Sequence, residues 1–181
     1  MAVEVSQELE LKSKILSGVN KLAGAVTATL GPGGRNVLIH DADGSIRVTK
    51  DGVSVSKAFT ALTDPIENTA VQLMKTVAQK AVDHVGDGTT TATLLAHSIV
   101  TEGFKAIDAN SNPIQVKVGI DKAVKAVLAE LKNISEDIGT EEQIKQVAQL
   151  SANGDVEIAS LITQALDYVG DDGAVSITEI S

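Results

Sequence analysis

Apolar residues recur every three or four positions along most of the chain, and residues that start or stop helices separate these runs. The first run covers residues 7–30, and the glycine- and proline-rich segment 31–34 ends it. Such spacing is typical of amphipathic helices. Proline blocks a continuing helix and glycine relaxes the turn that follows. The chain is therefore predicted to be mainly helical.

Cap residues predict where the later helices begin. Asp64-Pro65 combines an N-cap with proline at the first helical position, and Asn112-Pro113 repeats the pattern. Thr140 and Gln143 form a capping box. Another helix is predicted to start at the threonines 89–91. These helices are predicted to end at Gly86, near Asn110, near Ile134 and at Gly170, with a break at 153–155. The predicted buried face of the helix after Asp64 consists of Ile66, Ala70, Leu73, Met74, Val77 and Ala81.

Short β-branched segments predict a few strands. Residues 36–40 and 46–49, joined by the turn Asp41–Gly44, predict a β-hairpin. Residues 174–178 predict one more strand, just before the sequence stops. Because a lone strand is not stable, the chain is predicted to be a piece of a longer protein. The alternative is a terminal strand that pairs elsewhere in this chain.

Composition excludes several classes of protein. Aromatic residues make up only 2% of the 181 residues, so the core is predicted to consist of Ala, Val, Leu and Ile. The formal net charge of −9 argues against nucleic-acid binding, which depends on Lys and Arg. No apolar run is long enough to cross a membrane. Without a signal peptide or any cysteine, the chain is predicted to be cytoplasmic.

The segment Gly86-Asp87-Gly88, followed by Thr89, Thr90 and Thr91, is a candidate ligand-binding turn. A helix N-terminus presents free N–H groups to phosphate, and glycines allow close approach. The lysine of a Walker loop is absent. The helix end stabilises a nearby anion by only about 0.3–1 kcal/mol, which cannot offset the repulsion between the Asp87 carboxylate and phosphate. Asp87 is therefore predicted to bind phosphate through Mg²⁺. The alternative is a plain Asp-Gly turn with Thr89 as the N-cap.

Two further loops have a similar character. Thr29–Asn36 is rich in glycine, but its spacing and its place after a helix exclude a Rossmann fingerprint. Thr49–Val53 places Asp51 at the end of a predicted strand. The ordinary alternatives are a helix C-cap for the first loop and an Asp-Gly turn for the second. Spacing alone does not show that the three loops meet at one ligand.

These segments together resemble the group I chaperonins, the GroEL type, over nearly the whole chain and in order. The combination is far more specific than any one motif. The matching strings are TLGPGGRNV (29–37), TKDGVSV (49–55), GDGTTTAT (86–93), TEG (101–103), NP (112–113), GIDKAV (119–124) and SAN (151–153).

The resemblance implies a domain organisation. Residues 1–133 would be the first half of a helical equatorial domain that binds ATP and contains the hairpin. Residues 134–181 would be the ascending part of an α/β intermediate domain, which acts as a hinge. The apical domain and the returning halves of both domains would be absent from this chain.

The resemblance also implies roles for individual residues. Asp51 would act in hydrolysis near the attacking water, Asp87 would bind Mg²⁺, and Lys50 would lie near the phosphates and a monovalent cation such as K⁺. An aspartate important for hydrolysis would come from the missing returning half. The first nucleotide loop would be Thr29, Leu30, Gly31 and Pro32, and the phosphate-binding turn would be Gly88, Thr89, Thr90 and Thr91.

Some features depart from the family pattern. Gly33 stands where lysine is common, the segment 83–85 replaces small residues, and the hairpin is one residue longer than usual. These departures suggest a divergent member, such as a viral one or a second copy, with altered nucleotide affinity.

The function implied is that of an ATP-hydrolysing chaperone. Subunits would form a homo-oligomeric ring, usually one of two seven-membered rings. Non-native polypeptide and a lid-like co-chaperonin would bind the missing apical domain. The first alternative is a non-enzymatic scaffold or assembly element, and the second is a regulator that binds nucleotide without turnover.

Overall fold

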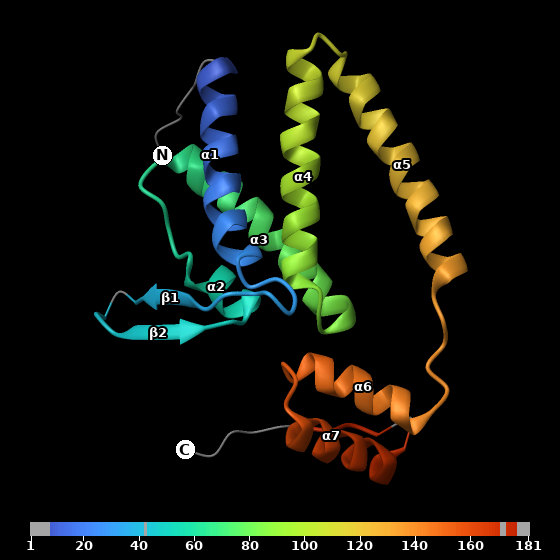
Figure 1. The fold of residues 1–181 in the computed structure, drawn as a ribbon. Helices are drawn as coiled ribbons and strands as arrows, with labels where there is room; N and C mark the ends of the chain where they lie inside the picture. The colour runs from blue at the N-terminus through green and yellow to red at the C-terminus, as the bar shows by residue number, and fades with distance from the viewer. Residues whose placement is uncertain (1–7, 42, 171–172, 177–181) are drawn as a thin grey trace. The chain divides into compact units, whose positions relative to one another are not determined.

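The computed structural model describes residues 8–41, 43–170 and 173–176. In this part the chain forms seven helices and one two-stranded antiparallel sheet (Figure 1), which confirms a mainly helical fold with a small hairpin. The elements are α1 (Glu8–Thr27), β1 (Val37–His40), β2 (Ile46–Thr49), α2 (Gly52–Ala58), α3 (Pro65–Val85), α4 (Thr89–Asp108), α5 (Pro113–Ile134), α6 (Glu141–Ser151) and α7 (Val156–Val169).

The chain divides into two compact units, Met1–Val124 and Lys125–Ser181. The boundary between them falls inside α5, whereas the predicted domain boundary lies near the end of that helix, after residue 133. The assignment of the two parts to equatorial and intermediate domains stays a prediction.

The core of the first unit lies where α1, α3 and α4 pack against one another (Figure 1). Aliphatic side chains and one methionine fill it, and Phe59 packs only at its edge. Burying one such large side chain contributes about 1.5–3 kcal/mol. The predicted aliphatic core is therefore confirmed for this unit. Its buried members are Val19, Leu22, Val26, Ile39, Val55, Ala70, Val71 and Met74.

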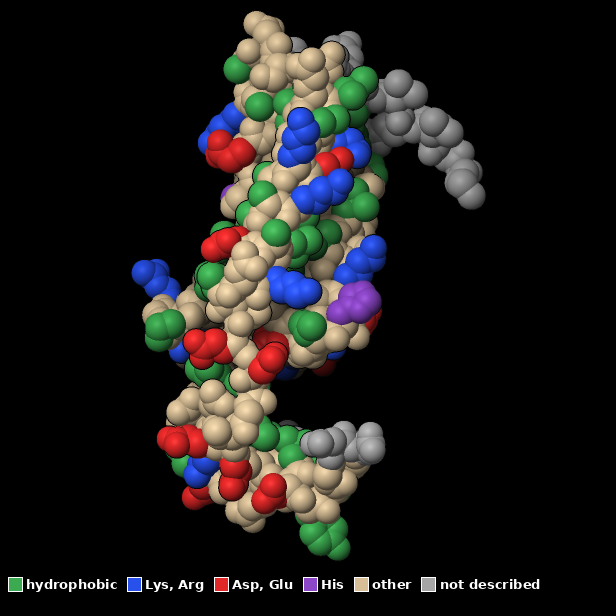
Figure 2. Space-filling view, turned by 90° about the vertical axis from the view of Figure 1, so that its right-hand side faces the viewer, with side chains coloured by type: hydrophobic (Ala, Val, Ile, Leu, Met, Phe, Trp, Pro, Cys, Tyr) green, Lys and Arg blue, Asp and Glu red, His purple; other side chains and the backbone are tan. Residues whose placement is uncertain are grey.

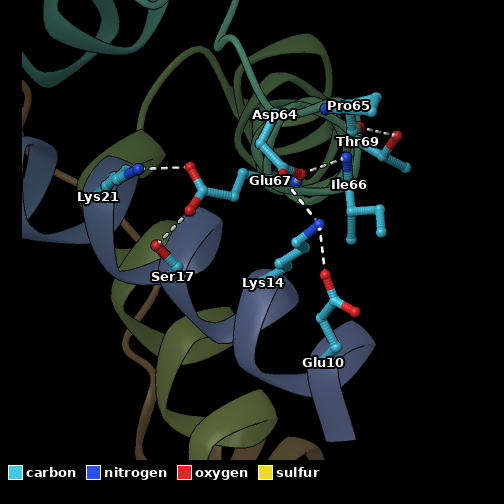
Figure 3. A network of polar contacts seen from close by, with 9 residues as sticks. All are labelled: Glu10, Lys14, Ser17, Lys21, Asp64, Pro65, Ile66, Glu67 and Thr69. Carbon is cyan, nitrogen blue, oxygen red and sulfur yellow. Dashed lines mark hydrogen bonds and ion pairs between the residues drawn. The ribbon is translucent and has the colours of Figure 1, made fainter. Parts of the chain in front are cut away.

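Polar contacts fix the start of α3 against α1 (Figure 3). Lys14 lies 3.0 Å from Asp64, and Glu67 accepts hydrogen bonds from Ser17 (2.7 Å) and Lys21. The Lys21 contact, followed by that of Ser17, lowers the pKa of Glu67. The contact therefore stabilises the fold at neutral pH and is lost as the pH falls through that lowered pKa. Gly18 allows the close approach, since a Cβ there would lie 2.4 Å from the Glu67 carbonyl oxygen.

The predicted helix caps are confirmed where local chemistry determines them. The Asp64 carboxylate accepts hydrogen bonds from the N–H groups of Ile66 (2.9 Å) and Glu67 (3.1 Å). Gly86 ends α3 in a left-handed conformation, with φ of 75°. Thr140 and Gln143 form the complete capping box of α6.

The predicted end of the first helix, at residue 30, is wrong. α1 ends at Thr27, because the chain turns so that the N–H groups of Thr29 and Leu30 bond the Val26 and Thr27 carbonyls. The loop then folds back, and the Arg35 N–H reaches the Ala28 carbonyl at 2.7 Å. Apolar periodicity continued to Leu30, but these turn contacts replace the helical ones.

The predicted buried face of α3 is only partly correct. Ala70 and Met74 are buried, but Leu73 is 64% exposed and Val77 is 42% exposed, while Val71 and Ala78 are buried. Leu73 and Val77 instead line an open apolar groove of about 520 Å³ beside α1 and α4. α3 is therefore apolar on two neighbouring faces, of which the described residues cover one.

The predicted hairpin is confirmed, with β1 starting at Val37. Leu38 pairs with Val48, and His40 pairs with Ile46. Ile39 faces the core, whereas Leu38, Ile46 and Val48 on the opposite face are exposed. An isolated hairpin is only marginally stable in water, and Ile39 attaches this one to the helices.

The second unit contains the α6–α7 helix pair. Ala148 of α6 and Ala159 of α7 are buried, as is Thr163. Residues 174–176 are not in a strand, and residues 177 and 178 of the predicted strand lie outside the described part. The described residues of this unit offer no strand that could pair with one, so the predicted α/β character is not seen among them.

Hydrophobic side chains remain on the surface of the chain. Figure 2 shows them between charged side chains on one face. No residue of α5 is buried, and Val127, Leu128 and Leu131 of that helix are exposed. None of the helices in the described part of the chain is both long and apolar enough to span a membrane.

Candidate nucleotide site

Three segments that are far apart in the sequence meet at the start of α2. A Cβ built on Gly52 would lie 2.3 Å from Thr90 Oγ1 and 3.3 Å from Thr29 Oγ1. Thr29 follows α1, Gly52 begins α2, and Thr90 lies in the first turn of α4. The structure thus brings one residue of each predicted loop together, which spacing alone did not show. Glycine is needed here, because any side chain at position 52 would displace a threonine hydroxyl.

The first loop, residues 29–35, is a tight turn. The Thr29 hydroxyl donates a hydrogen bond to the Val26 carbonyl at 2.7 Å, and this side chain is buried. Gly31 has a φ of 69°, which favours glycine. The Gly34 N–H bonds the Gly31 carbonyl at 2.9 Å. Leu30 and Pro32 are exposed on this turn, where a ligand could contact them.

Asp51 lies between β2 and α2 and caps the helix. Its Oδ1 accepts from the Val53 N–H at 3.1 Å, and its Oδ2 accepts from the Ser54 N–H at 2.8 Å and the Ser54 hydroxyl at 2.7 Å. Sequence reasoning did not single out Ser54, although a serine three residues after a capping aspartate can reach its carboxylate. Lys50 is exposed, and the described residues show no contact that joins it to the threonine turn.

The pKa of Asp51 is shifted by two opposing effects. Partial burial raises the pKa, but the hydrogen bonds from Ser54 and Val53 together lower it below its ordinary value. Hydrogen bonds to a carboxylate favour its charged form. Asp51 is therefore ionised at neutral pH and can accept a proton only weakly.

The turn before α4 leaves the N-terminus of that helix open. Gly86 and Gly88 are both left-handed, with φ of 75° and 89°. The Asp87 Oδ1 accepts a 2.6 Å hydrogen bond from the Gly88 N–H, and its side chain is exposed. Gly88 is the N-cap of α4, and no side chain caps this end. The alternative that made Thr89 the N-cap is therefore wrong.

The three threonines after Gly88 have different surroundings. Thr90 points toward Gly52 and Thr29, as the close approach at Gly52 shows. Thr91 is exposed. Thr89 is 5% exposed, and its hydroxyl has no hydrogen-bond partner. Buried polar groups are normally paired, so this unpaired hydroxyl would gain from an acceptor that reaches it.

The residues present fit a magnesium-bound phosphate. Mg²⁺ usually keeps several waters and takes one or two carboxylates together with phosphate oxygens. The exposed Asp87 carboxylate can supply that ligand beside the uncapped N–H groups of α4. The described residues contain no group of three acidic, histidine or cysteine side chains that could hold a metal by themselves. A metal site here would therefore depend on phosphate oxygens and water.

The close packing at Gly52 leads to a stability prediction. Gly52→Ala is expected to lower the free energy of unfolding by about 1–3 kcal/mol, the usual cost of overpacking, because its Cβ would overlap Thr90 Oγ1. Urea denaturation of the full-length subunit measures the change. Gly33→Ala is the control, because a Cβ there meets nothing within 4 Å. If Gly52→Ala were as stable as the control, Thr90 would move aside at no cost and the packing would not hold the three segments in place.

Comparisons with known proteins indicate the family and the fold of the chain. The sequence model of the TCP-1/cpn60 chaperonin family matches residues 22–180. A group III chaperonin in the open state superposes with a TM-score of 0.76 and 25% identity, covering 93% of this chain and 33% of that one. The chaperonin gp146 from the bacteriophage EL 2 (Pseudomonas aeruginosa), in the presence of ATP-BeFx, superposes with a TM-score of 0.72 and 28% identity, covering 86% and 27%.

The chain thus spans about a third or less of the length of these two structures. They include a group III and a phage chaperonin, so the group I assignment and a viral origin stay predictions. The family model covers most of the sequence, and the helical fold agrees with it. The chain therefore belongs to the TCP-1/cpn60 chaperonin family.

Proposed function

We propose that this chain is the N-terminal part of an ATP-hydrolysing chaperonin subunit. The observation that carries the proposal is the meeting of Thr29, Gly52 and Thr90 beside the uncapped N-terminus of α4. Nucleotide binding is further supported by gp146, a related chaperonin whose structure was determined in the presence of ATP-BeFx.

Phosphate binding would fall to the start of α4. Its first N–H groups have no side-chain cap, and they carry the positive end of the helix dipole. The hydroxyls of Thr90 and Thr91 add donors, and Thr89 has a buried hydroxyl that lacks a partner. Leu30, Gly31 and Pro32 would form one wall of the nucleotide site, on the exposed side of the first loop.

Asp87 would hold the metal and Asp51 would act on water. A magnesium ion at Asp87 would neutralise phosphate charge and so remove the repulsion between carboxylate and phosphate. Asp51 would orient the attacking water and accept its proton as a weak general base. Lys50 and K⁺ would add positive charge near the phosphates, a role that only the family resemblance supports.

The remaining functions belong to a longer protein. Ring assembly, binding of non-native polypeptide, a co-chaperonin lid, a second catalytic aspartate and a cytoplasmic location are proposed from the family resemblance. Nucleotide would close the intermediate segment over the site, and that closure would gate the ring. Exposed apolar surfaces on the hairpin, α3 and α5 are available for contacts with such further segments or subunits.

The test compares the 181-residue chain with the full-length subunit. We expect the full-length protein to hydrolyse ATP with Mg²⁺ and to refold a denatured client. The chain alone is expected to do neither, and to self-associate or unfold readily, because the apolar groove between α1, α3 and α4 stays open to water. Phosphate release, client refolding and sedimentation measure these properties.

Each other outcome has a distinct meaning. A stable monomeric 181-residue chain with steady ATPase activity would show that the site is complete within this chain. A full-length protein that binds ATP without hydrolysis would favour a nucleotide-binding regulator. A protein that neither binds nor hydrolyses ATP would favour the scaffold.

A further inference from the structure

The Asp51 carboxylate is held by more contacts than an N-cap requires. One backbone N–H would be enough to cap α2, but Asp51 accepts from two N–H groups and from the Ser54 hydroxyl at 2.7 Å. The hydroxyl bonds the same oxygen, Oδ2, that the Ser54 N–H already bonds. The extra contact therefore fixes the carboxylate beyond what helix capping needs.

The two carboxylate oxygens of Asp51 differ in how many further hydrogen bonds each can accept. An ionised carboxylate has about four acceptor positions, two on each oxygen. Oδ2 has both of its positions filled by Ser54, whereas Oδ1 has one filled by the Val53 N–H. Asp51 is exposed, so the free position on Oδ1 is accessible to water.

We propose that Ser54 is a positioning residue for ATP hydrolysis, whose hydroxyl occupies Oδ2 and leaves Oδ1 as the atom that receives the proton of the attacking water. This inference rests on the proposed function. As the water oxygen forms its bond to the γ-phosphorus, its proton passes to Oδ1 and the bond to the bridging oxygen of ADP breaks. The proton then returns from Oδ1 to solvent.

Loss of the hydroxyl has a defined consequence. Without Ser54 Oγ, the N–H groups of Val53 and Ser54 still hold the carboxylate, but one acceptor position on Oδ2 opens. Water can then bond Oδ2 as well, so the attacking water is no longer directed to Oδ1 alone. The Ser54 side chain is also the largest of the hydrogen-bond contributions that lower the pKa of Asp51, and its removal therefore raises that pKa. A base works only when ionised, so the acidic limb of the rate profile moves to higher pH.

The experiment uses the full-length subunit with ATP and Mg²⁺. Ser54→Ala is expected to lower kcat on the order of tenfold, to leave ATP affinity unchanged, and to move the acidic limb of kcat to higher pH. Ser54→Thr keeps a hydroxyl and is expected to restore both properties. Ser54→Val has nearly the shape of threonine without the hydroxyl, so the Thr and Val pair decides the question if Ser54→Ala fails to fold.

The control removes a serine hydroxyl from another position of the same helix. Ser56 lies two residues further along α2, on nearly the opposite side of the helix, and Ser56→Ala is expected to keep the wild-type kcat and pH profile. The proposal would be overturned by an unchanged kcat and pH profile in Ser54→Ala and Ser54→Val. It would also be overturned by an equal loss of kcat in Ser56→Ala, or by a loss of activity that comes from weaker ATP binding. A wild-type subunit that binds ATP without hydrolysing it would overturn the proposed function and this inference together.

Discussion

Asp51→Asn in the full-length subunit is expected to bind ATP with nearly unchanged affinity and to hydrolyse it about 10²–10⁴-fold more slowly, the usual contribution of a positioned acid–base group. The single amide oxygen of asparagine can still accept an N–H group and cap α2, although the amide nitrogen that replaces the other oxygen can only donate. Asparagine cannot act as the base. Single-turnover hydrolysis, together with a titration of ATP binding, separates the two properties. The expected result is a loss in the chemical step alone.

Asp51→Ala provides a second, less specific comparison. It is expected to lose the same hydrolysis and, in addition, about 0.5–2 kcal/mol of stability, because alanine cannot cap α2 as the Asp51 carboxylate does. If either variant lost binding while the bound fraction still hydrolysed ATP normally, Asp51 would be a structural turn residue and its catalytic role would be wrong.

Asp87→Ala in the full-length subunit is expected to abolish ATP turnover and to weaken the part of nucleotide binding that depends on Mg²⁺. The Asp87 carboxylate is exposed beside the open end of α4. It would repel a phosphate bound there unless a cation lay between the two. ATP affinity measured with Mg²⁺ and with EDTA gives the magnesium-dependent part. The variant and the wild type are expected to differ with Mg²⁺ and to become similar in EDTA.

Asp108→Ala is a matched control for this change. Asp108 is the last residue of α4, about 30 Å along the helix from its start. Its substitution is expected to remove the ion pair with Lys12 and to leave turnover intact. If binding and turnover were both unchanged in Asp87→Ala, the metal role of Asp87 would have to be abandoned.

Helix boundaries were predictable where a few neighbouring residues determine them. The cap at Asp64, the glycine stop at Gly86 and the capping box at Thr140 were all predicted and are all present. Each depends on hydrogen bonds within three or four residues, so the sequence contains the whole interaction. The end of α1 was predicted wrongly although the turn bonds of Thr29 and Leu30 are also short in sequence, because apolar spacing continues to Leu30 and does not reveal them, and because the Arg35 bond to Ala28 spans seven residues.

The surfaces that helices bury depended on partners far away in the sequence. α3 is apolar on two adjacent faces, and periodicity alone assigned Leu73 and Val77 to the core. In the folded chain, Val71 and Met74 belong to the buried core cluster, whereas Leu73 and Val77 line an open groove beside α1 and α4. A helix face is buried only when another element packs on it, and no local pattern states which face that will be.

The sequence by itself determined the helical class, the hairpin, most helix ends and the family, because each depends on local hydrogen bonding, apolar spacing or a run of matching motifs. The open end of α4 and the Ser54–Asp51 contact are local features that the motifs did not reveal, whereas only the tertiary structure decided that Thr29, Gly52 and Thr90 meet. Packing of α1, α2 and α4 against one another brings these groups within contact distance. Contacts between residues tens of positions apart arise from that packing, and their spacing along the chain does not encode it.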